Sequence, residues 1–137
     1  MQRIKWIPLM ALQCLVYCVS AQDCTLDLAG TKLDTFIKIF QLNDTQTAQA
    51  EQWQAEVQLH LNVLEEEATT LLAKQPQHTP EELTALAQKY RAVQDKMIGI
   101  SANYDVKLVS VLNEKQYQRY LDLCGEAVRR PLERNPE

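Results

Sequence analysis

Hydrophobic residues recur at intervals of three and four along most of the chain after residue 21, and no segment there alternates as a β-strand does. The spacing predicts two long helices, over residues 44–74 and 80–111. It also predicts a short first helix, marked by Leu26, Ala29, Leu33, Phe36, Ile37 and Phe40. A fourth helix is expected to open near residue 114, to carry Tyr117, Leu121, Cys124 and Val128 on one side, and to end at Pro131.

Two copies of one short phrase mark the starts of helices. Leu42-Asn43-Asp44-Thr45-Gln46 and Leu112-Asn113-Glu114-Lys115-Gln116 both have the form L-N-x-x-Q. Asparagine is a strong N-cap residue, and glutamine three positions later completes a capping box. A third box, Thr79-Pro80-Glu81-Glu82, follows a break in the pattern and adds proline at the first helical position. The phrases therefore predict helix caps at Asn43, Thr79 and Asn113.

The break at residues 75–78 is short, so the two long helices should pack side by side and antiparallel. That arrangement brings Leu42 and Leu112 to the same end of the hairpin, from which both short helices leave. We therefore predict an all-α fold: a long antiparallel helical hairpin with a shorter helix at each end of the chain. Residues 22–130 would form this single domain, and residues 131–137 a loose C-terminal tail.

The first residues have the features of a secretory signal peptide, assigned to residues 1–21. Arg3 and Lys5 precede a mostly apolar stretch, and Val19-Ser20-Ala21 supplies the small residues that a signal peptidase reads. We expect cleavage after Ala21 and export to the periplasm or secretion. The apolar stretch is short for a bilayer, which needs about 20 residues, so no integral membrane segment is expected after cleavage. A retained membrane anchor is the alternative.

Cleavage would leave Cys24 and Cys124 as the cysteines of the mature chain. Two cysteines in an exported protein most simply form a disulfide, which here would join the two outer helices. Closing a loop of about 100 residues contributes on the order of 4–5 kcal/mol in the chain-entropy model. Two free thiols, or a redox pair, are the alternatives, although no C-x-x-C spacing is present.

Charge and chemistry narrow the classes of function. Without Arg3 and Lys5 the chain has 12 Lys and Arg residues against 18 Asp and Glu residues, a formal charge of −6. Such an acidic chain is a poor candidate for a nucleic-acid partner, because phosphate contacts need a basic face. No nucleophile lies near a base at a recognisable spacing, and Glu65-Glu66-Glu67 would point apart on a helix. Neither an enzyme nor a cofactor is expected.

The histidines offer one alternative for a metal, a surface ion site at His60 and Glu56. His60 and His78 are the two in the chain, and Glu56 lies one helical turn from His60. A zinc site needs three or four ligands, and the two mature thiols are expected to be oxidised. The sequence therefore assigns no metal ligand.

Both long helices carry a second apolar stripe on the side away from the first. It comprises Ala48, Ala55, Leu59 and Val63 in one helix, and Ile98, Ala102, Val106 and Val109 in the other. A helix that is apolar on two sides must be covered on two sides. The outer helices can supply that cover, or the stripe can form a binding or self-association face. The candidate partner face consists of Leu59, Val63, Ile98, Val106 and Val109, with Tyr117 and Tyr120 near the shared end.

The doubled phrase resembles the pair of L-T-x-x-Q phrases in the Spy/CpxP family of periplasmic helical proteins, with Asn43 and Asn113 in place of threonine. The resemblance covers residues 42–124. It implies a curved helical homodimer that acts as an ATP-independent chaperone (holdase) for unfolded or envelope client proteins, or that modulates an envelope-stress sensor. Related members bind zinc or sense metals, so a metal-binding protein is one alternative. A structural secreted helical bundle is another.

Overall fold

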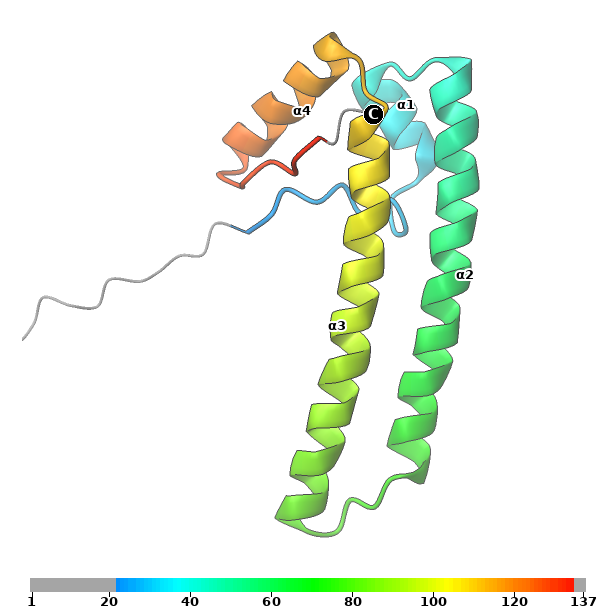
Figure 1. Ribbon diagram of the computed structural model, residues 1–137, viewed down its shortest axis with the longest axis vertical. Helices are drawn as coiled ribbons and strands as arrows, with labels where there is room; N and C mark the ends of the chain where they lie inside the picture. Colours follow the sequence, from blue (N-terminus) through cyan, green and yellow to red (C-terminus); the bar gives the residue numbers. More distant parts are fainter. Residues whose placement is uncertain (1–21, 135–137) are drawn as a thin grey trace, which may run out of the picture.

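The computed structural model describes residues 22–134, which form four helices. They are α1 (Leu33–Phe40), α2 (Asp44–Lys74), α3 (Pro80–Ser110) and α4 (Glu114–Glu126). Helices α2 and α3 form a long antiparallel hairpin, and α1 and α4 lie at the end where α2 begins and α3 ends (Figure 1). No β-strand occurs in these residues. The predicted all-α fold, a long hairpin with one shorter helix before it and one after it in the chain, is confirmed.

The molecule has two regions of different construction (Figure 1). We call residues 22–61 and 100–134 the head, because they include α1, α4 and both terminal segments. The remainder of the hairpin, residues 62–99, is the arm. The head contains a continuous hydrophobic core, formed by Cys24, Leu28, Phe36, Phe40, Leu42, Ala50, Val57, Tyr104, Leu108, Val109, Leu112, Tyr120 and Cys124. The buried hydrophobic residues of the arm are Leu64, Leu86 and Val93.

The predicted signal peptide, residues 1–21, lies outside the described residues. Within residues 22–134, no helix is both long and apolar enough to cross a membrane.

All three predicted capping boxes are present, and they fix the starts of α2, α3 and α4. The Asn43 side chain accepts a hydrogen bond from the Gln46 N–H at 2.9 Å, and the Gln46 side chain accepts one from the Asn43 N–H at 3.0 Å. Asn113 and Gln116 repeat this exchange in α4, at 3.0 and 2.9 Å. Thr79 caps α3 in the same way. Local chemistry alone therefore sets these boundaries.

Helix α1 begins later than the spacing predicts. The predicted helix included Leu26, but residues 27–31 form a turn and α1 starts at Leu33. Asp27 has a left-handed backbone conformation, with φ at 54°, and the N–H groups three and four residues later both donate to its carbonyl oxygen. A right-handed helix cannot pass through a left-handed residue, so the first part of the predicted helix is a turn.

Helix α4 ends after Glu126, earlier than the predicted stop at Pro131. The Val128 N–H donates to the carbonyl oxygen of Gly125 at 3.1 Å, and the next N–H donates to that of Cys124 at 2.9 Å. These two bonds make a Schellman motif, in which Val128, with φ at 53°, occupies the left-handed position that glycine usually fills. The chain therefore reverses at Val128.

After this reversal the chain returns along the N-terminal segment. The Cys24 N–H donates to the carbonyl oxygen of Arg130 at 2.8 Å, and the Arg130 N–H donates to a carbonyl of the same segment at 3.0 Å. The Arg134 guanidinium lies over the ring of Tyr117 in α4, 4.5 Å from its centre. The sequence predicts a loose tail from residue 131; residues 131–134 instead lie against the head, and residues 135–137 lie outside the described residues.

Candidate functional site

The two L-N-x-x-Q phrases meet at the shared end of the hairpin through their glutamines. Gln46 Nε2 donates to Gln116 Oε1 at 2.7 Å, and Gln116 Nε2 donates to Gln46 Oε1 at 3.0 Å. Each Nε2 also donates to the carbonyl that precedes the other phrase, Val111 for Gln46 and Gln41 for Gln116. The predicted placement of Leu42 and Leu112 at one end is consistent with this contact, because both are buried in the head core.

Each buried carboxamide uses its full hydrogen-bonding capacity. Gln46 and Gln116 each donate twice through Nε2, and each Oε1 accepts from its own N-cap N–H and from the other carboxamide. A buried polar network with every member satisfied favours a single arrangement of the elements that contribute to it. The doubled phrase therefore has a structural role: it caps two helices and joins them. The sequence predicts the caps but not the paired amides.

A second polar anchor, Asp105 of α3, was not anticipated from the sequence. Its carboxylate is 1% exposed and accepts three backbone hydrogen bonds, from Leu26 and Asp27 at Oδ2 and from Leu28 at Oδ1. Burial raises the pKa of Asp105, and the three backbone hydrogen bonds act in the opposite direction. The sequence signal was a lone acidic residue within the second apolar stripe of this helix.

These contacts hold residues 22–32, which we call the clasp, against the hairpin. From α2, Gln54 Nε2 donates to the carbonyl oxygens of Leu28 and Thr31, both at 2.8 Å. From α3, Asp105 accepts the three consecutive N–H groups. The clasp therefore bridges both long helices and covers part of the second stripe of α3.

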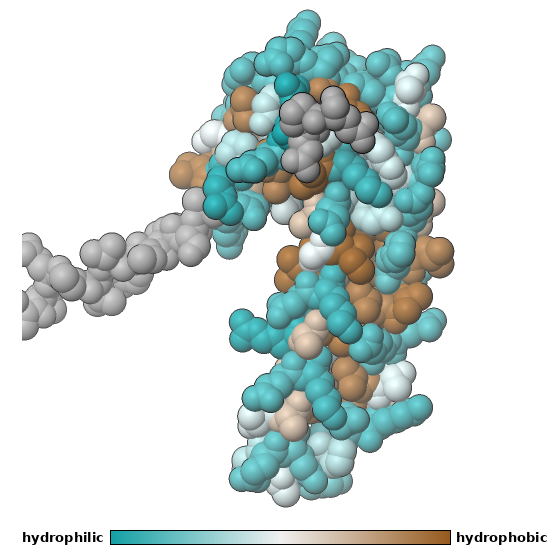
Figure 2. Space-filling model, in the orientation of Figure 1, coloured by the Kyte–Doolittle hydropathy of each residue, from teal (hydrophilic) through white to brown (hydrophobic). Residues whose placement is uncertain are grey.

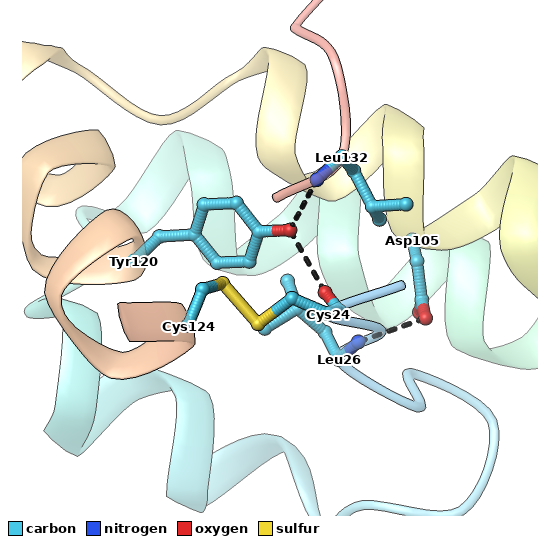
Figure 3. The surroundings of a disulfide bond; sticks show 6 residues. All are labelled: Cys24, Leu26, Asp105, Tyr120, Cys124 and Leu132. Atoms are coloured by element: carbon cyan, nitrogen blue, oxygen red, sulfur yellow. Dashed lines mark hydrogen bonds between the residues drawn. A yellow bond between two sulfur atoms is a disulfide. The ribbon is translucent and has the colours of Figure 1, made fainter. Parts of the chain in front are cut away.

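The third attachment of the clasp is to α4, through a disulfide and a tyrosine (Figure 3). The predicted disulfide between Cys24 and Cys124 is confirmed. It joins α4 to the clasp rather than to α1, because Cys24 precedes the first helix. Beside it, Tyr120 Oη donates to the Cys24 carbonyl oxygen and accepts from the Leu132 N–H, both at 2.8 Å. Burial raises the pKa of this phenol.

A polar cluster lies on the surface of the hairpin within the head. Tyr104 Oη donates to Glu56 Oε2 at 3.2 Å, and Lys107 Nζ lies 4.2 Å from the centre of the Tyr104 ring. The His60 ring centre is 6.3 Å from that of Tyr104. A hydrogen bond from Gln52 is the main cause that lowers the pKa of Glu56, while burial raises that of Tyr104. The cluster joins α2 to α3 through the Tyr104–Glu56 hydrogen bond.

The histidines are placed apart in the structure. His60 lies in α2 beside Glu56, and His78 lies in the loop between α2 and α3, at the far tip of the arm. Within residues 22–134, no three His, Cys, Asp or Glu side chains are grouped so that they could hold a metal ion.

The residues of the predicted partner face do not share one environment. Leu59, Val63 and Ile98 are 67%, 60% and 67% exposed. Val106 and Tyr117 are half-buried, whereas Val109 and Tyr120 are completely buried in the head core. Both belong to the head core, and Tyr120 points from α4 toward the clasp, where it bonds to the Cys24 carbonyl (Figure 3). Val109 and Tyr120 therefore cannot form part of an exposed face.

The three most exposed large apolar side chains of the long helices, Leu59, Val63 and Ile98, lie where the head meets the arm, and Figure 2 shows hydrophobic surface across both helices at this level. Ile98 lines a hollow of about 610 Å³ with Leu61, Met97 and Ala102, and residues of the clasp form its rim. Leu59 lies between Val57 and Leu61 in the chain. At 100° per residue it points away from the side of α2 that packs on α3. We call Leu59, Val63 and Ile98 the apolar belt.

Comparison of the chain with protein-family models, curated proteins and solved structures finds no match. The resemblance to the Spy/CpxP family therefore rests on the doubled phrase, and the proposal of a function rests on the geometry.

Proposed function

We propose that the protein is an exported helical interaction protein, a Spy/CpxP-like ATP-independent chaperone that holds apolar segments of unfolded or envelope client proteins. The observation that supports this proposal is the apolar belt. Its three large side chains are 60–67% exposed, although the inner faces of the same helices are already packed. Burying one such side chain against a client contributes at most about 1.5–3 kcal/mol. Contacts of this size give the weak, reversible binding that a holdase needs.

The construction of the head supports the same proposal. The clasp, the disulfide and the paired amides fix the ends of α2 and α3, so the belt is presented without further ordering of the chain. A disulfide also favours an oxidising compartment, as in the periplasm or outside the cell. Charged side chains next to the belt, including Glu65-Glu66-Glu67, keep apolar patches small and discourage aggregation of the free protein.

The alternatives differ in what they leave unexplained. A structural bundle accounts for the burial of Val109 and Tyr120, but it gives no reason for the exposure of the belt. A metal-binding role is not supported by the separated histidines. An envelope-stress modulator would use the belt to bind one folded sensor instead of many unfolded clients, and a homodimer would cover it with a second copy.

The test is suppression of aggregation by the oxidised mature chain. A thermally aggregating client such as citrate synthase is heated with increasing amounts of the protein while light scattering is followed. The variant Leu59→Gln/Val63→Gln/Ile98→Gln should lose most of the suppression. The control Leu72→Gln/Leu83→Gln replaces two side chains that are 48% and 49% exposed nearer the tip of the arm, and it should retain suppression. Unchanged scattering with the wild-type chain at every ratio would end the holdase proposal.

A second measurement separates client binding from self-association. Size exclusion with light scattering gives the mass of the oxidised chain, and the belt variant is measured beside it. If the wild type is a dimer, the belt variant is a monomer, and neither protein suppresses client aggregation, the belt serves self-association. That result would count against the holdase proposal. A monomer that suppresses aggregation would support client binding directly.

A further inference from the structure

The head contains another hollow, which shares no residue with the apolar belt. Its volume is about 520 Å³, and it lies between the end of α1 and the beginning of α4. The residues that line it are Lys38, Ile39, Phe40 and Gln41 on one side and Asn113, Lys115, Gln116 and Arg119 on the other.

The charge of this hollow is opposite to that of the chain as a whole. Lys38, Lys115 and Arg119 line it, and no acidic side chain does. Within residues 22–134, none of these three cations takes part in a salt bridge. Lys115 and Arg119 are four residues apart on α4, a spacing at which like charges destabilise a helix by a few tenths of a kcal/mol. The three cations therefore line the hollow without a direct ion pair, and an anion bound there would supply one.

The other walls of the hollow favour an organic ligand over a bare anion. Ile39 is 39% exposed there and provides an apolar surface beside the cations. Pockets for organic ligands are typically about 300–1,000 Å³, so this hollow has room for more than a single phosphate ion. Gln116 contributes no free polar group, because its amide is fully used in the pair with Gln46.

We infer that this hollow binds an acidic peptide segment, with side-chain carboxylates on Lys38, Lys115 and Arg119 and a neighbouring apolar side chain on Ile39. An anionic membrane surface is the less suitable partner. The cations line a concavity, which an extended peptide segment can enter and the flat surface of a bilayer cannot. The inference is independent of the proposed holdase activity, which uses the belt.

The probe is a fluorescein-labelled peptide of alternating Glu and Leu, with a Lys–Leu peptide as the charge control. Fluorescence anisotropy is measured with the oxidised chain at physiological ionic strength. The variant Lys38→Gln/Lys115→Gln/Arg119→Gln should bind the Glu–Leu peptide about tenfold or more weakly, since each surface ion pair contributes up to about 1 kcal/mol. Lys38→Arg/Lys115→Arg keeps the charges and should retain binding.

The matched control is Lys74→Gln/Arg91→Gln/Arg129→Gln, which removes the same charge from exposed positions outside the hollow. It should bind like the wild type, because charges farther away than about 8 Å are screened at this ionic strength. Equal loss in both triple variants would show nonspecific attraction and overturn the inference. Displacement of the peptide by an equal concentration of inorganic phosphate would also overturn the inference. Binding of the chain to phosphatidylglycerol vesicles, without binding to the peptide, would overturn it as well.

The two proposals fail separately. The hollow variant should still suppress client aggregation, and the belt variant should still bind the Glu–Leu peptide. Circular dichroism melting confirms that each variant is folded, which is expected because none of the three substituted cations is buried. Loss of peptide binding in the belt variant alone would place the peptide on the belt and reject the hollow.

Discussion

The head and the arm are built from the same two helices, but they are held together in different ways. In the head, apolar packing is supplemented by buried polar anchors: the paired amides of Gln46 and Gln116, the Asp105 carboxylate and the Tyr120 hydroxyl. In the arm, two helices pack on each other with few buried residues, and the ion pair between Lys96 and Glu67 is long (3.9 Å) and exposed. The buried polar groups that fix one arrangement of the helices are therefore concentrated in the head.

This difference suggests a division of roles. Satisfied buried polar groups disfavour alternative packings, so the head should open only when the whole domain unfolds. A two-helix arm with little buried apolar surface should open locally at lower free energy. The apolar belt lies between the two regions, where rigid support from the head meets a more adaptable surface.

The largest effect should come from removing the disulfide. Cys24→Ser/Cys124→Ser is expected to lower the free energy of unfolding by about 4 kcal/mol, because the bridge closes a long loop in the unfolded chain. Urea denaturation of the oxidised wild type and of the variant measures the change. Hydrogen exchange should show that the arm amides are affected least. A variant as stable as the wild type would mean that the other anchors of the clasp suffice.

The next largest effect should come from Asp105→Asn. The substitution keeps the shape but places an N–H₂ group against a backbone N–H of the clasp, which leaves a buried donor unsatisfied and costs about 3 kcal/mol. Asp95→Asn, at an exposed position of the same helix, is the control and should be neutral. Denaturation gives the stability, and exchange of the Leu26–Leu28 amides reports the clasp directly. Unchanged protection of those amides would contradict the assigned role.

A smaller effect tests the paired amides. Gln46→Ala, Gln116→Ala and the double variant form a thermodynamic cycle that isolates the interaction between the two side chains. We expect a coupling energy of about 1–2 kcal/mol, from two buried hydrogen bonds that are lost together. Additive effects would show that each glutamine acts only as a cap for its own helix.

The sequence predicts those features that local chemistry determines. The capping boxes at Asn43, Thr79 and Asn113 involve residues three apart, and the helix starts follow from them. The antiparallel hairpin follows from the short break between two long apolar patterns, and the disulfide from the two cysteines that follow the predicted signal peptide.

Features that depend on distant residues were missed. The turn before α1 is held by Asp105, which is 77–79 residues away in sequence, so the apolar spacing around Leu26 wrongly favoured a helix. The end of α4 was misplaced for a local reason, because a valine in the left-handed position gives no sequence signal for a Schellman motif. Val109 and Tyr120 were assigned to a partner face although both are buried in the head core, where Tyr120 bonds to Cys24, 96 residues away in sequence.

The head and the arm each contain a capping box, so removing one box at a time compares the stability of the two regions. Asn113→Ala and Thr79→Ala each remove a capping box, at a cost of about 1 kcal/mol to the helix concerned. In the head, the loss after Asn113→Ala should appear in the global free energy of unfolding. In the arm, Thr79→Ala should mainly increase hydrogen exchange near the tip, because that region opens before the rest. Equal global losses in both variants would show one cooperative unit.

The smallest expected effect is a gain in stability at the end of α4. Val128 has a left-handed backbone, which costs a residue with a β-carbon about 1–2 kcal/mol, and its side chain is 85% exposed. Val128→Gly removes that strain but adds about 0.5–1 kcal/mol of conformational freedom to the unfolded chain, so a net gain of about 0.5–1 kcal/mol is expected. Val128→Ala keeps a β-carbon and should gain less. Thermal denaturation of the three oxidised proteins gives the order. If Val128→Gly melted below the wild type, the valine would have to make a contact that compensates for its backbone, and the end of α4 would belong with the packed part of the head rather than its strained edge.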